Sequence, residues 1–408
     1  GFTCARSSTG LVKCWGYNGR GALGLGDSLD RGDGPATVPS RLSALDLGTG
    51  RKAISISAGG GSTCALLDNG DLKCWGNHAY GQLGTGDTND LGDLPGEMGD
   101  ALKPVPLGAK RAIGVSVGAA HTCVILDGGS VECWGSNDYG QLGQNHRKEI
   151  LSPKDLAPVK LARPVAIAVS ASSFLDAGKG GDFGNSSCAL LDNGSVQCWG
   201  ETKFVPHSDS TDIDSSGAIG DYTGEMNGVP VLTFGSGRQA KSLVAGSVSG
   251  AILDDGSLKL WGMGSQLGQP DLAPNPVGLM PGELASLPAV RVGSGKKVKS
   301  ISVSRHYACA VLDDKSVKCW GQGWSGELGL GDTFSTDGAP ENVPPVSLGG
   351  VGAQQVATGY NHTCAILVDG TMKCWGNNSS GQLGLGDSIN RGDTGTSLSA
   401  DTTVDLAF

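Results

Sequence analysis

The sequence predicts an all-β fold built from seven similar units, and three observations support this. First, a phrase close to Ser62–Gly76, STCALLDNGDLKCWG, returns at seven places along the 408 residues. Second, successive tryptophans of these copies lie 55 to 65 residues apart. That period suits a four-stranded blade of a β-propeller and is too long for the common helical repeats. Third, no stretch shows a sustained helical period.

Each copy of the phrase has the pattern of a β-hairpin. Asp68-Asn69-Gly70, between two apolar runs, is typical of a three-residue loop whose last position needs glycine, because the backbone there is left-handed. With the loop centred on its asparagine, Cys64 lies opposite Cys74 at a site where the two strands approach most closely. The seven hairpins are centred near residues 9, 69, 128, 193, 255, 314 and 369.

The cysteines predict one disulfide across each of six hairpins. The copy at residues 250–262 has Gly250 and Leu260 at the two cysteine positions, so both cysteines are lost together and all twelve others pair. Joint loss is expected of a disulfide and not of a free or catalytic thiol. Small buried thiols in a reduced protein are the alternative, and zinc ligation is disfavoured by the spacing of ten. The predicted pairs are Cys4–Cys14, Cys64–Cys74, Cys123–Cys133, Cys188–Cys198, Cys309–Cys319 and Cys364–Cys374.

Disulfides of this kind predict an oxidising compartment, and the chain is expected to be extracellular or displayed on a cell surface. It shows no signal peptide, so a mature or trimmed chain is the simplest account. The formal charge is -10 and no long Lys/Arg run is present, which disfavours a nucleic-acid partner. No apolar segment of 18 residues is present, so no membrane span is expected.

The rest of each unit is expected to supply two further strands within a single domain, residues 1–408. The first resembles Ala53–Ala58, and the fourth resembles Pro104–Gly108 after a glycine-rich segment such as Tyr80–Gly86. The fourth unit departs most from this plan. It has an insertion at Ser172–Gly184, and the loop Glu201–Gly228 replaces the usual Gly-Gln-Leu-Gly.

The first unit is predicted to lack one strand. Residues 1–4 already belong to a hairpin, and Val404–Phe408 fits the fourth-strand pattern, so the C-terminal residues do not supply the missing piece. Residues outside this numbering complete the blade, or it has three strands, or a neighbouring molecule contributes a strand. An open strand edge is a pairing liability that also serves assembly.

Other polar positions give weaker signals. Four glycine-rich segments end in an aspartate: Asp27, Asp87, Asp332 and Asp387. Carboxylates in such loops could bind calcium, but capping of turns is the favoured interpretation. Possible N-glycosylation sites are Asn185, Asn193, Asn361, Asn377 and Asn378. Of these, Asn193, Asn377 and Asn378 are expected to be exposed. Trp324, outside the repeat position, is expected in the core or at a blade edge, with a surface contact as the alternative.

The recurring motifs resemble those of the regulator of chromosome condensation repeat family. They are hydrophobic-Ser-x-Gly, His-Thr-Cys-Ala, Cys-Trp-Gly and Gly-Gln-Leu-Gly-x-Gly-Asp, and the resemblance covers essentially the whole chain. It implies a seven-bladed β-propeller, with His121, His306 and His362 at the family's histidine position in a structural role. The family includes nuclear exchange factors for the GTPase Ran that bind chromatin. This chain lacks a basic tail, is acidic, and has cysteine pairs unsuited to a reducing nucleus.

The sequence therefore favours an extracellular structural or adhesive propeller. Its expected partners are other copies of itself or extracellular matrix and surface proteins, as in a filament, matrix or appendage. A secreted ligand- or glycan-binding module is the alternative, and a Ran-type guanine nucleotide exchange factor is the distant one. No Ser/His/Asp set, distinctive carboxylate pair or phosphate loop is present, so neither an enzyme nor a cofactor is expected.

Overall fold

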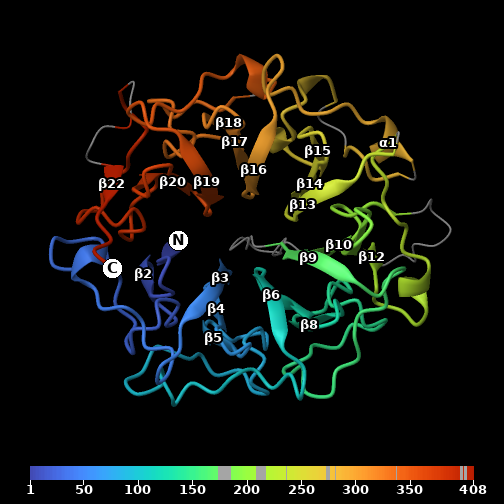
Figure 1. Ribbon diagram of the computed structural model, residues 1–408, viewed down its shortest axis with the longest axis horizontal. Helices are drawn as coiled ribbons and strands as arrows, with labels where there is room; N and C mark the ends of the chain where they lie inside the picture. The colour runs from blue at the N-terminus through green and yellow to red at the C-terminus, as the bar shows by residue number, and fades with distance from the viewer. Residues whose placement is uncertain are drawn as a thin grey trace.

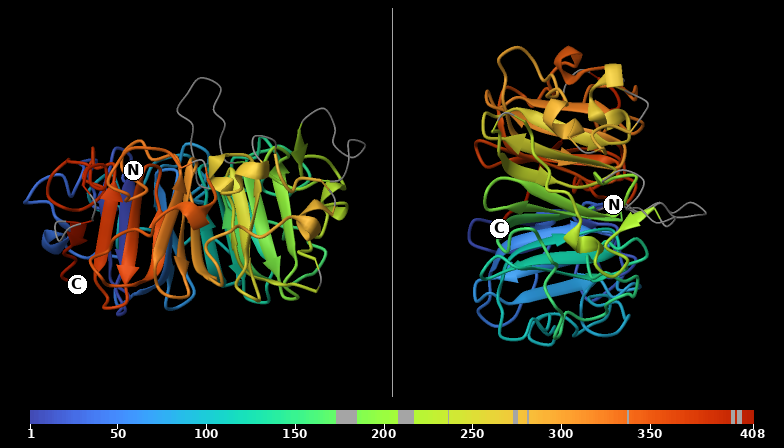
Figure 2. Two further views of the ribbon diagram at one scale, coloured as in Figure 1. Left: turned by 90° about the horizontal axis from the view of Figure 1, so that it is seen from above. Right: turned by 90° about the vertical axis from the view of Figure 1, so that its right-hand side faces the viewer.

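The computed structural model describes residues 1–172, 185–207, 217–235, 237–272, 276–280, 282–336, 338–395, 398 and 402–408. Seven antiparallel sheets follow one another around a central axis and form a closed ring (Figure 1). The strands run across the thickness of the disc (Figure 2). The predicted seven-bladed β-propeller is therefore confirmed.

Each blade is ordered from the axis outward. The innermost strands are β3 (Ala53–Gly59), β6 (Ala112–Val117), β9 (Ala166–Ala171), β13 (Ala240–Val244), β16 (Val298–Val303) and β19 (Ala353–Thr358). The second strands are β1 (Phe2–Arg6), β4 (Ser62–Leu67), β7 (His121–Leu126), β10 (Ser186–Leu191), β14 (Val248–Leu253), β17 (Tyr307–Leu312) and β20 (His362–Leu367). The third strands are β2 (Val12–Gly16), β5 (Leu72–Gly76), β8 (Val131–Gly135), β11 (Val196–Glu201), β15 (Leu258–Gly262), β18 (Val317–Gly321) and β21 (Met372–Gly376).

The second and third strands form the predicted hairpins in the predicted register. Cys64 pairs with Cys74, and the amide of Leu67 donates to the Asp71 carbonyl to close the three-residue loop at 2.8 Å. Gly70 has φ +84°, the left-handed conformation that the loop requires. In the sixth blade Lys315 replaces this glycine and still adopts φ +71°. The turn therefore sets the register of the hairpin, even where a lysine must adopt the left-handed conformation that favours glycine.

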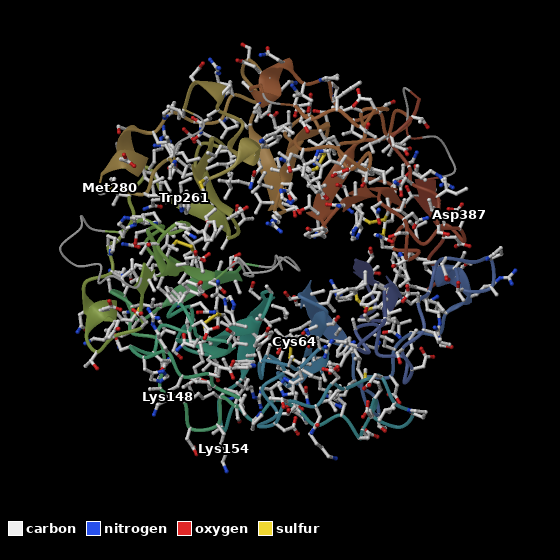
Figure 3. The ribbon with its side chains drawn as sticks, turned by 180° about the vertical axis from the view of Figure 1, so that it is seen from behind. Cys64, Lys148, Lys154, Trp261, Met280 and Asp387 are labelled. Atoms are coloured by element: carbon white, nitrogen blue, oxygen red, sulfur yellow. A yellow bond between two sulfur atoms is a disulfide. The ribbon has the colours of Figure 1, made fainter. Side chains whose placement is uncertain are left out.

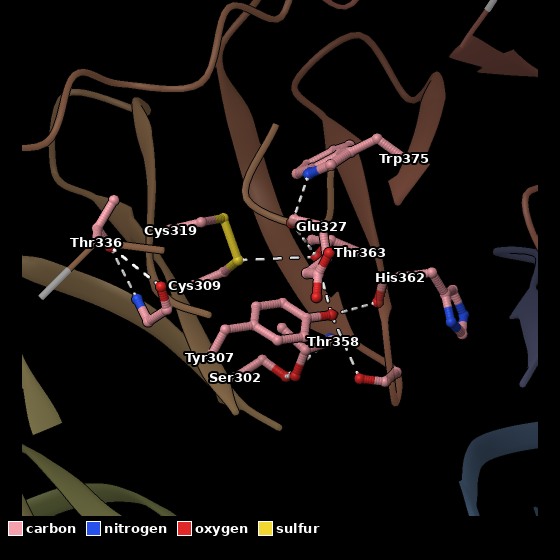
Figure 4. Close-up of a disulfide and its surroundings, with 12 residues drawn as sticks. Ser302, Tyr307, Cys309, Cys319, Glu327, Thr336, Thr358, His362, Thr363 and Trp375 are labelled. Atoms are coloured by element: carbon pink, nitrogen blue, oxygen red, sulfur yellow. Dashed lines mark hydrogen bonds between the residues drawn. A yellow bond between two sulfur atoms is a disulfide. The ribbon is translucent and has the colours of Figure 1, made fainter. Parts of the chain in front are cut away.

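Neighbouring blades are joined by a carbonyl in the Gly-x-Leu-Gly segment. The Gln82 carbonyl accepts hydrogen bonds from the indole of Trp134, at 3.0 Å, and from Thr122 Oγ1, at 2.9 Å, both in the next blade. A Cβ on Gly84 would lie 2.6 Å from Trp134 Nε1, which explains the glycine. The same pair of bonds joins blades six and seven, where Trp375 and Thr363 donate to the Glu327 carbonyl (Figure 4).

The joint between the fourth and fifth blades lacks this bond. Trp261 is fully buried, but its indole nitrogen has no hydrogen-bond partner among the described residues. The fourth blade has the loop Glu201–Gly228 where the other blades have Gly-x-Leu-Gly, so the accepting carbonyl is lost. Residues 173–184 and 208–216 of the predicted insertion and loop lie outside the described residues.

The predicted fourth strand is much reduced. In the second blade its pairing is a single bond, from the Val105 amide to the Leu72 carbonyl at 2.7 Å. Within the described residues, the outer position carries only two assigned strands, β12 (Ala218–Ile219) and β22 (Thr403–Val404). The short helices are the α-helix α1 (Glu283–Ser286) and the 3₁₀ turns Pro39–Arg41, Glu225–Asn227, Ser265–Leu267, Pro270–Leu272 and Pro340–Asn342.

Buried lysines hold the outer segments in place of a full fourth strand. Lys73 Nζ donates to the carbonyls of Leu47 and Gly99 at 2.9 and 2.8 Å, and burial lowers the pKa of its ammonium group. The lysine two residues before Trp-Gly repeats this contact in five blades: Lys13, Lys73, Lys259, Lys318 and Lys373. Side-chain hydrogen bonds thus replace the strand pairing that the sequence predicted.

The ring closes between the last and the first blade. Trp15 and Thr3 both donate to the Gln382 carbonyl, at 3.1 and 2.8 Å. β22 completes the outer edge of the last blade by pairing with β21, and Lys13 of the first blade donates to the carbonyls of Leu406 and Ala407. The C-terminal residues therefore lie at the outer edge of the ring, as predicted.

Candidate functional site

The structure forms all six predicted disulfides, and the chain has no free cysteine (Figure 3). The Cα atoms of each pair lie 4.0–4.1 Å apart, which places the bonds directly across the hairpins. Most of the cysteines are buried between neighbouring blades; Cys4 is only half-buried. The bonds are internal supports that stabilise each hairpin.

The fifth blade shows why its two cysteines are absent together. The Leu260 side chain fills the space that a disulfide occupies in the other blades. A Cβ on Gly250 would lie 2.2 Å from Leu260 Cδ2, so only glycine fits opposite this leucine. Loss of one cysteine alone would leave a clash or a hole.

The possible glycosylation sites differ sharply in exposure. Asn193 is exposed at its hairpin tip, whereas Asn361 and Asn377 are half-buried. The expectation for Asn378 is wrong, because it is 0% exposed, accepts a hydrogen bond from the Leu383 amide and donates to the Asp387 carbonyl. Asn185 is 2% exposed and bonded to Gln141 and Glu201. Burial at these two positions leaves no room for a glycan.

The aspartates of the glycine-rich segments cap turns. Asp27, Asp87, Asp332 and Asp387 each accept a hydrogen bond from the amide two residues later, at 2.9–3.0 Å. Asp27 and Asp387 also pair with Arg31 and Arg391, at 2.5 and 2.7 Å. In the described part of the chain, no three His, Cys, Asp or Glu side chains gather as metal ligands. The turn-capping interpretation is confirmed.

Two of the three predicted structural histidines join neighbouring blades. His121 Nε2 lies 2.9 Å from Ser187 Oγ, and His362 Nε2 lies 3.0 Å from Thr3 Oγ1. Burial lowers the pKa of His121 to about 4, and burial together with the nearby N-terminal ammonium lowers that of His362 to about 3. In the sixth blade Tyr307 takes this position and donates to the His362 carbonyl at 2.5 Å (Figure 4). His306 lies one residue before this position. Its predicted place at the family's histidine position is therefore wrong.

The first blade contains an open strand edge. Its sheet has only β1 and β2 among the described residues, whereas the other blades have a strand inside the second one. Cys4 forms a non-hydrogen-bonded pair with Cys14, so its own N–H and C=O point away from β2, toward the axis. Phe2 and Arg6 have the same orientation by alternation. Figure 1 shows this blade between β3 and β20, with the N-terminus near the centre.

A cavity of about 1090 Å³ occupies the place of the missing strand. It is lined by β1, by β3 and by the last blade, with Ile54 and Ala357 among the lining residues, and it extends along the axis to Gly246 and Val303 of the fifth and sixth blades. We call this space, between β1, β3 and β19, the open slot. Its lining includes Arg6, Arg20 and Arg305 but no Asp or Glu, although the chain as a whole is acidic.

Aromatic side chains lie at one end of the open slot. Tyr17 and Tyr360 line it, and the His306 ring lies 6.2 Å from Tyr360 and 5.2 Å from Trp324 between centroids. Trp324 is 56% exposed, so the expected core position is wrong and the surface alternative fits the structure. We call these four residues the aromatic rim. Exposed Tyr, Trp and Arg are the side chains that most often dominate protein interfaces.

Comparisons with known proteins agree with this geometry. A model of the regulator of chromosome condensation (RCC1) repeat matches residues 9–66, 69–125, 128–174 and 316–366, and a second model of the repeat matches 53–82, 112–141 and 353–382. The chain is 27% identical to the ultraviolet-B receptor UVR8 of Arabidopsis thaliana, over 93% of this chain and 76% of the receptor. It is 26% identical to the human E3 ubiquitin-protein ligase HERC2, over 94% of this chain but only 7% of the ligase.

Solved structures show the same fold. Prp20p from Saccharomyces cerevisiae superposes with a TM-score of 0.68 at 18% identity, covering 98% of this chain and 88% of that one. Human WBSCR16 superposes with a TM-score of 0.65 at 20% identity, covering 89% of this chain and 83% of that one. No helix in the described residues is long and apolar enough to cross a membrane. On the repeat-model matches, the chain belongs to the regulator of chromosome condensation (RCC1) repeat family.

Proposed function

We propose that this chain is an extracellular structural or adhesive propeller that works by binding other proteins, including copies of itself. The observation that carries the proposal is the full use of twelve cysteines in six disulfides. Such bonds persist in oxidising compartments and are rare in the cytosol and nucleus. The aromatic rim and the open slot supply an interaction surface on the same molecule.

The relatives point to protein binding and differ in compartment. Prp20p binds Gsp1p and histones. Histones are strongly basic, so the formal charge of -10 does not oppose such a partner; the six disulfides are what argue against a nuclear role. RUG3 of Arabidopsis thaliana, 29% identical over 77% of this chain, is mitochondrial. The six disulfides support export, with Asn193 as the proposed glycan site.

Measuring the free thiols of the native protein tests whether it matures in an oxidising compartment. The native protein, isolated from its source and treated with an alkylating reagent without reductant, is expected to gain no mass. Non-reducing peptide mapping is expected to recover the six cross-hairpin pairs. Free, alkylatable thiols in the native molecule would remove the case for export and reopen a Ran-type exchange activity.

A second candidate is a secreted glycan-binding module that uses the aromatic rim. The observation in its favour is the exposure of Trp324 and Tyr360, since sugar rings pack on exposed aromatic faces. Electron microscopy and a glycan array separate the two functions. Regular polymers support the structural role, and dispersed monomers that bind a glycan support the alternative.

The variant Trp324→Ala tests whether the aromatic rim is the binding surface, for the structural role and for the glycan-binding role alike. This variant is expected to weaken polymerisation or glycan binding, because it removes the largest exposed side chain of the rim. Phe334→Ala is the matched control, because Phe334 is also an exposed aromatic, at 75%, and is not part of the rim. Equal effects of the two substitutions would remove the rim from the proposal.

A further inference from the structure

The joint between the sixth and seventh blades contains a buried glutamate where three other joints contain a glutamine. Glu327 takes the place of Gln82, Gln141 and Gln382, seven residues after the repeat tryptophan of its blade. Its carbonyl accepts from the indole of the next blade, as in the other joints (Figure 4). The side chain is 0% exposed. The substitution therefore places a carboxylate inside a joint that elsewhere holds a neutral amide.

Glu327 cannot make all the hydrogen bonds that these glutamines make. The Oε1 atom of Gln82, Gln141 and Gln382 accepts from the amide two residues earlier, at 2.9 Å in each case. Glu327 Oε2 makes the same contact with the Ser325 amide, at 2.6 Å. Glu327 Oε1 therefore lies where a glutamine has its NH₂ group, and it has no hydrogen-bond partner among the described residues. An ionised carboxylate accepts hydrogen bonds and donates none.

The joint between the third and fourth blades shows which groups this oxygen faces. There Gln141 Nε2 lies 3.4 Å from Ser136 Oγ and 3.3 Å from Asn185 Oδ1. In the sixth and seventh blades the residues that match this serine and asparagine are Gln322 and Asn361. Gln322 Oε1 and Asn361 Oδ1 are buried, and they too have no partner in the described part of the chain. Three acceptor oxygens therefore converge with no donor between them.

A cation accounts for all three oxygens together. A proton on the carboxyl, or one amide turned by 180°, would still leave one amide oxygen without a partner. Burial raises the pKa of the Glu327 carboxyl, while the nearby backbone amides of Ser325 and Trp324 oppose this effect. A buried carboxylate is stable in its ionised form when a positive charge lies beside it.

We propose that Glu327, Gln322 and Asn361 bind a calcium ion between the sixth and seventh blades. Carboxylate and amide oxygens are ligands of hard cations, and calcium accepts about six to eight oxygens in irregular geometry, waters included. The carbonyl of Tyr360 is a fourth ligand by position, because the matching carbonyl of the sixth blade lies 2.8 Å from Gln266 Nε2. A single carboxylate gives a weak site, with a Kd of about 10⁻⁴–10⁻³ M, the range of extracellular calcium modules.

The calcium site lies at the base of the aromatic rim. Trp324 and Tyr360 of the rim are close neighbours of two ligands in the chain. The carbonyl of His306, another rim residue, accepts from the Gln322 amide at 2.9 Å. Calcium is therefore expected to fix the conformation of the rim and to strengthen binding through it. This coupling rests on the proposed function, whereas the site itself does not.

Calcium titration of the whole chain tests the site. The protein is treated with EGTA and then melted with and without calcium, at an ionic strength held constant with potassium chloride. Calcium at about 10 mM is expected to raise the melting temperature by about 1–2 °C. Magnesium and sodium at the same concentration are expected to give no rise. No rise with calcium, or an equal rise with either other cation, would overturn the proposal.

Two variants assign the effect to the buried carboxylate. Glu327→Gln restores the residue of the other joints and is expected to abolish the calcium response. In calcium-free buffer its melting temperature is expected to equal or exceed that of the wild type, because the new NH₂ group donates to the amide oxygens. Asp332→Asn is the matched control, since it removes one charge from a turn of the same blade. It is expected to keep the full response, and a response that survives Glu327→Gln or is lost in both variants would contradict the site.

Trp324 separates the calcium site from the aromatic rim. The seven repeat tryptophans are fully buried, so Trp324 supplies the fluorescence that is sensitive to solvent. Calcium is expected to shift this emission, and Trp324→Phe is expected to lose the shift while the rise in melting temperature remains. Polymerisation or glycan binding that does not change with calcium would overturn the coupling. A calcium response in a chain that neither polymerises nor binds glycans would support the site and remove the proposed function.

Discussion

β1 and β4 carry nearly the same residues, Phe-Thr-Cys-Ala-Arg and Ser-Thr-Cys-Ala-Leu, around the same cross-hairpin disulfide. β4 is buried throughout, whereas no residue of β1 is. The local sequence therefore sets the hairpin and its register, and the neighbouring inner strand sets its burial. In the first blade these two contributions are separated, because the hairpin is complete and the inner strand is missing.

The largest expected effect is a loss of folding stability at acidic pH, caused by the histidines buried between neighbouring blades. His121 and His362 are neutral in the folded state, with pKa values lowered to about 4 and about 3 mainly by burial. The unfolded chain takes up these protons below its ordinary pKa of 6.5, so stability is complete above pH 6.5 and falls toward pH 4. Each histidine is expected to cost about 3 kcal/mol over that range.

His121→Gln and His362→Gln compare an inner joint with the closing joint. Each variant is expected to flatten the fall in unfolding free energy between pH 6.5 and 4 by a similar amount, measured by urea denaturation. A much smaller change for His362→Gln would show that water reaches the joint beside the open slot, and the closed ring described here would be incorrect.

Disulfide removal gives the next largest effect. Cys64→Ala with Cys74→Ala is expected to lower the unfolding free energy by about 2–3 kcal/mol at most. The same change at Cys4 and Cys14 is expected to cost less, because Cys4 is only half-buried. Cys64→Gly with Cys74→Leu copies the fifth blade and is expected to recover part of the loss. A larger cost in the first blade than in the second would contradict the comparison.

The inter-blade hydrogen bond is expected to contribute less. Trp134→Phe removes the bond to the Gln82 carbonyl, whereas Trp261→Phe removes no such bond. Both lose similar packing, so the difference between their unfolding free energies is expected to be about 1 kcal/mol. Thermal or urea melts of the pair supply the measurement, and equal losses would mean that the bond does not stabilise the ring.

The smallest effect concerns the serines between inner strands. Ser57→Ala leaves the Val117 amide without its 2.9 Å acceptor and is expected to cost about 1 kcal/mol. Ala357→Ser places a hydroxyl at the matching position of the last blade, beside the open slot, and is expected to leave the melting temperature unchanged. Stabilisation by Ala357→Ser alone would show that the slot already holds an N–H donor for this hydroxyl.

The hairpins and disulfides could be predicted because they depend on residues within one short phrase. The loop glycine fixes the register, and the register places each cysteine opposite its partner. The reduced fourth strand could not be predicted in this way, because its place is held by Lys73 and its equivalents reaching carbonyls about 26 residues away in sequence. The lysine that recurs before Cys-Trp-Gly was the available signal.

The burial of Asn378 also had a signal in the sequence. The position two residues after Trp-Gly holds Asn18, His78, Asn137 and Asn378, and all four are fully buried. Each accepts a hydrogen bond from the amide of a leucine five residues later. A polar residue that recurs at one place in four of the seven units is typical of an internal cap. Exposure of Trp324 had no such signal, because it occurs in one blade alone.

Residue-resolved hydrogen exchange of the chain by itself tests the open edge most directly. The amides of Cys4 and Arg6 are expected to exchange much faster than those of Cys64 and Leu66, which occupy the same positions of a complete blade. Equal protection at the two pairs would contradict the account, because it would mean that the edge of β1 is already paired.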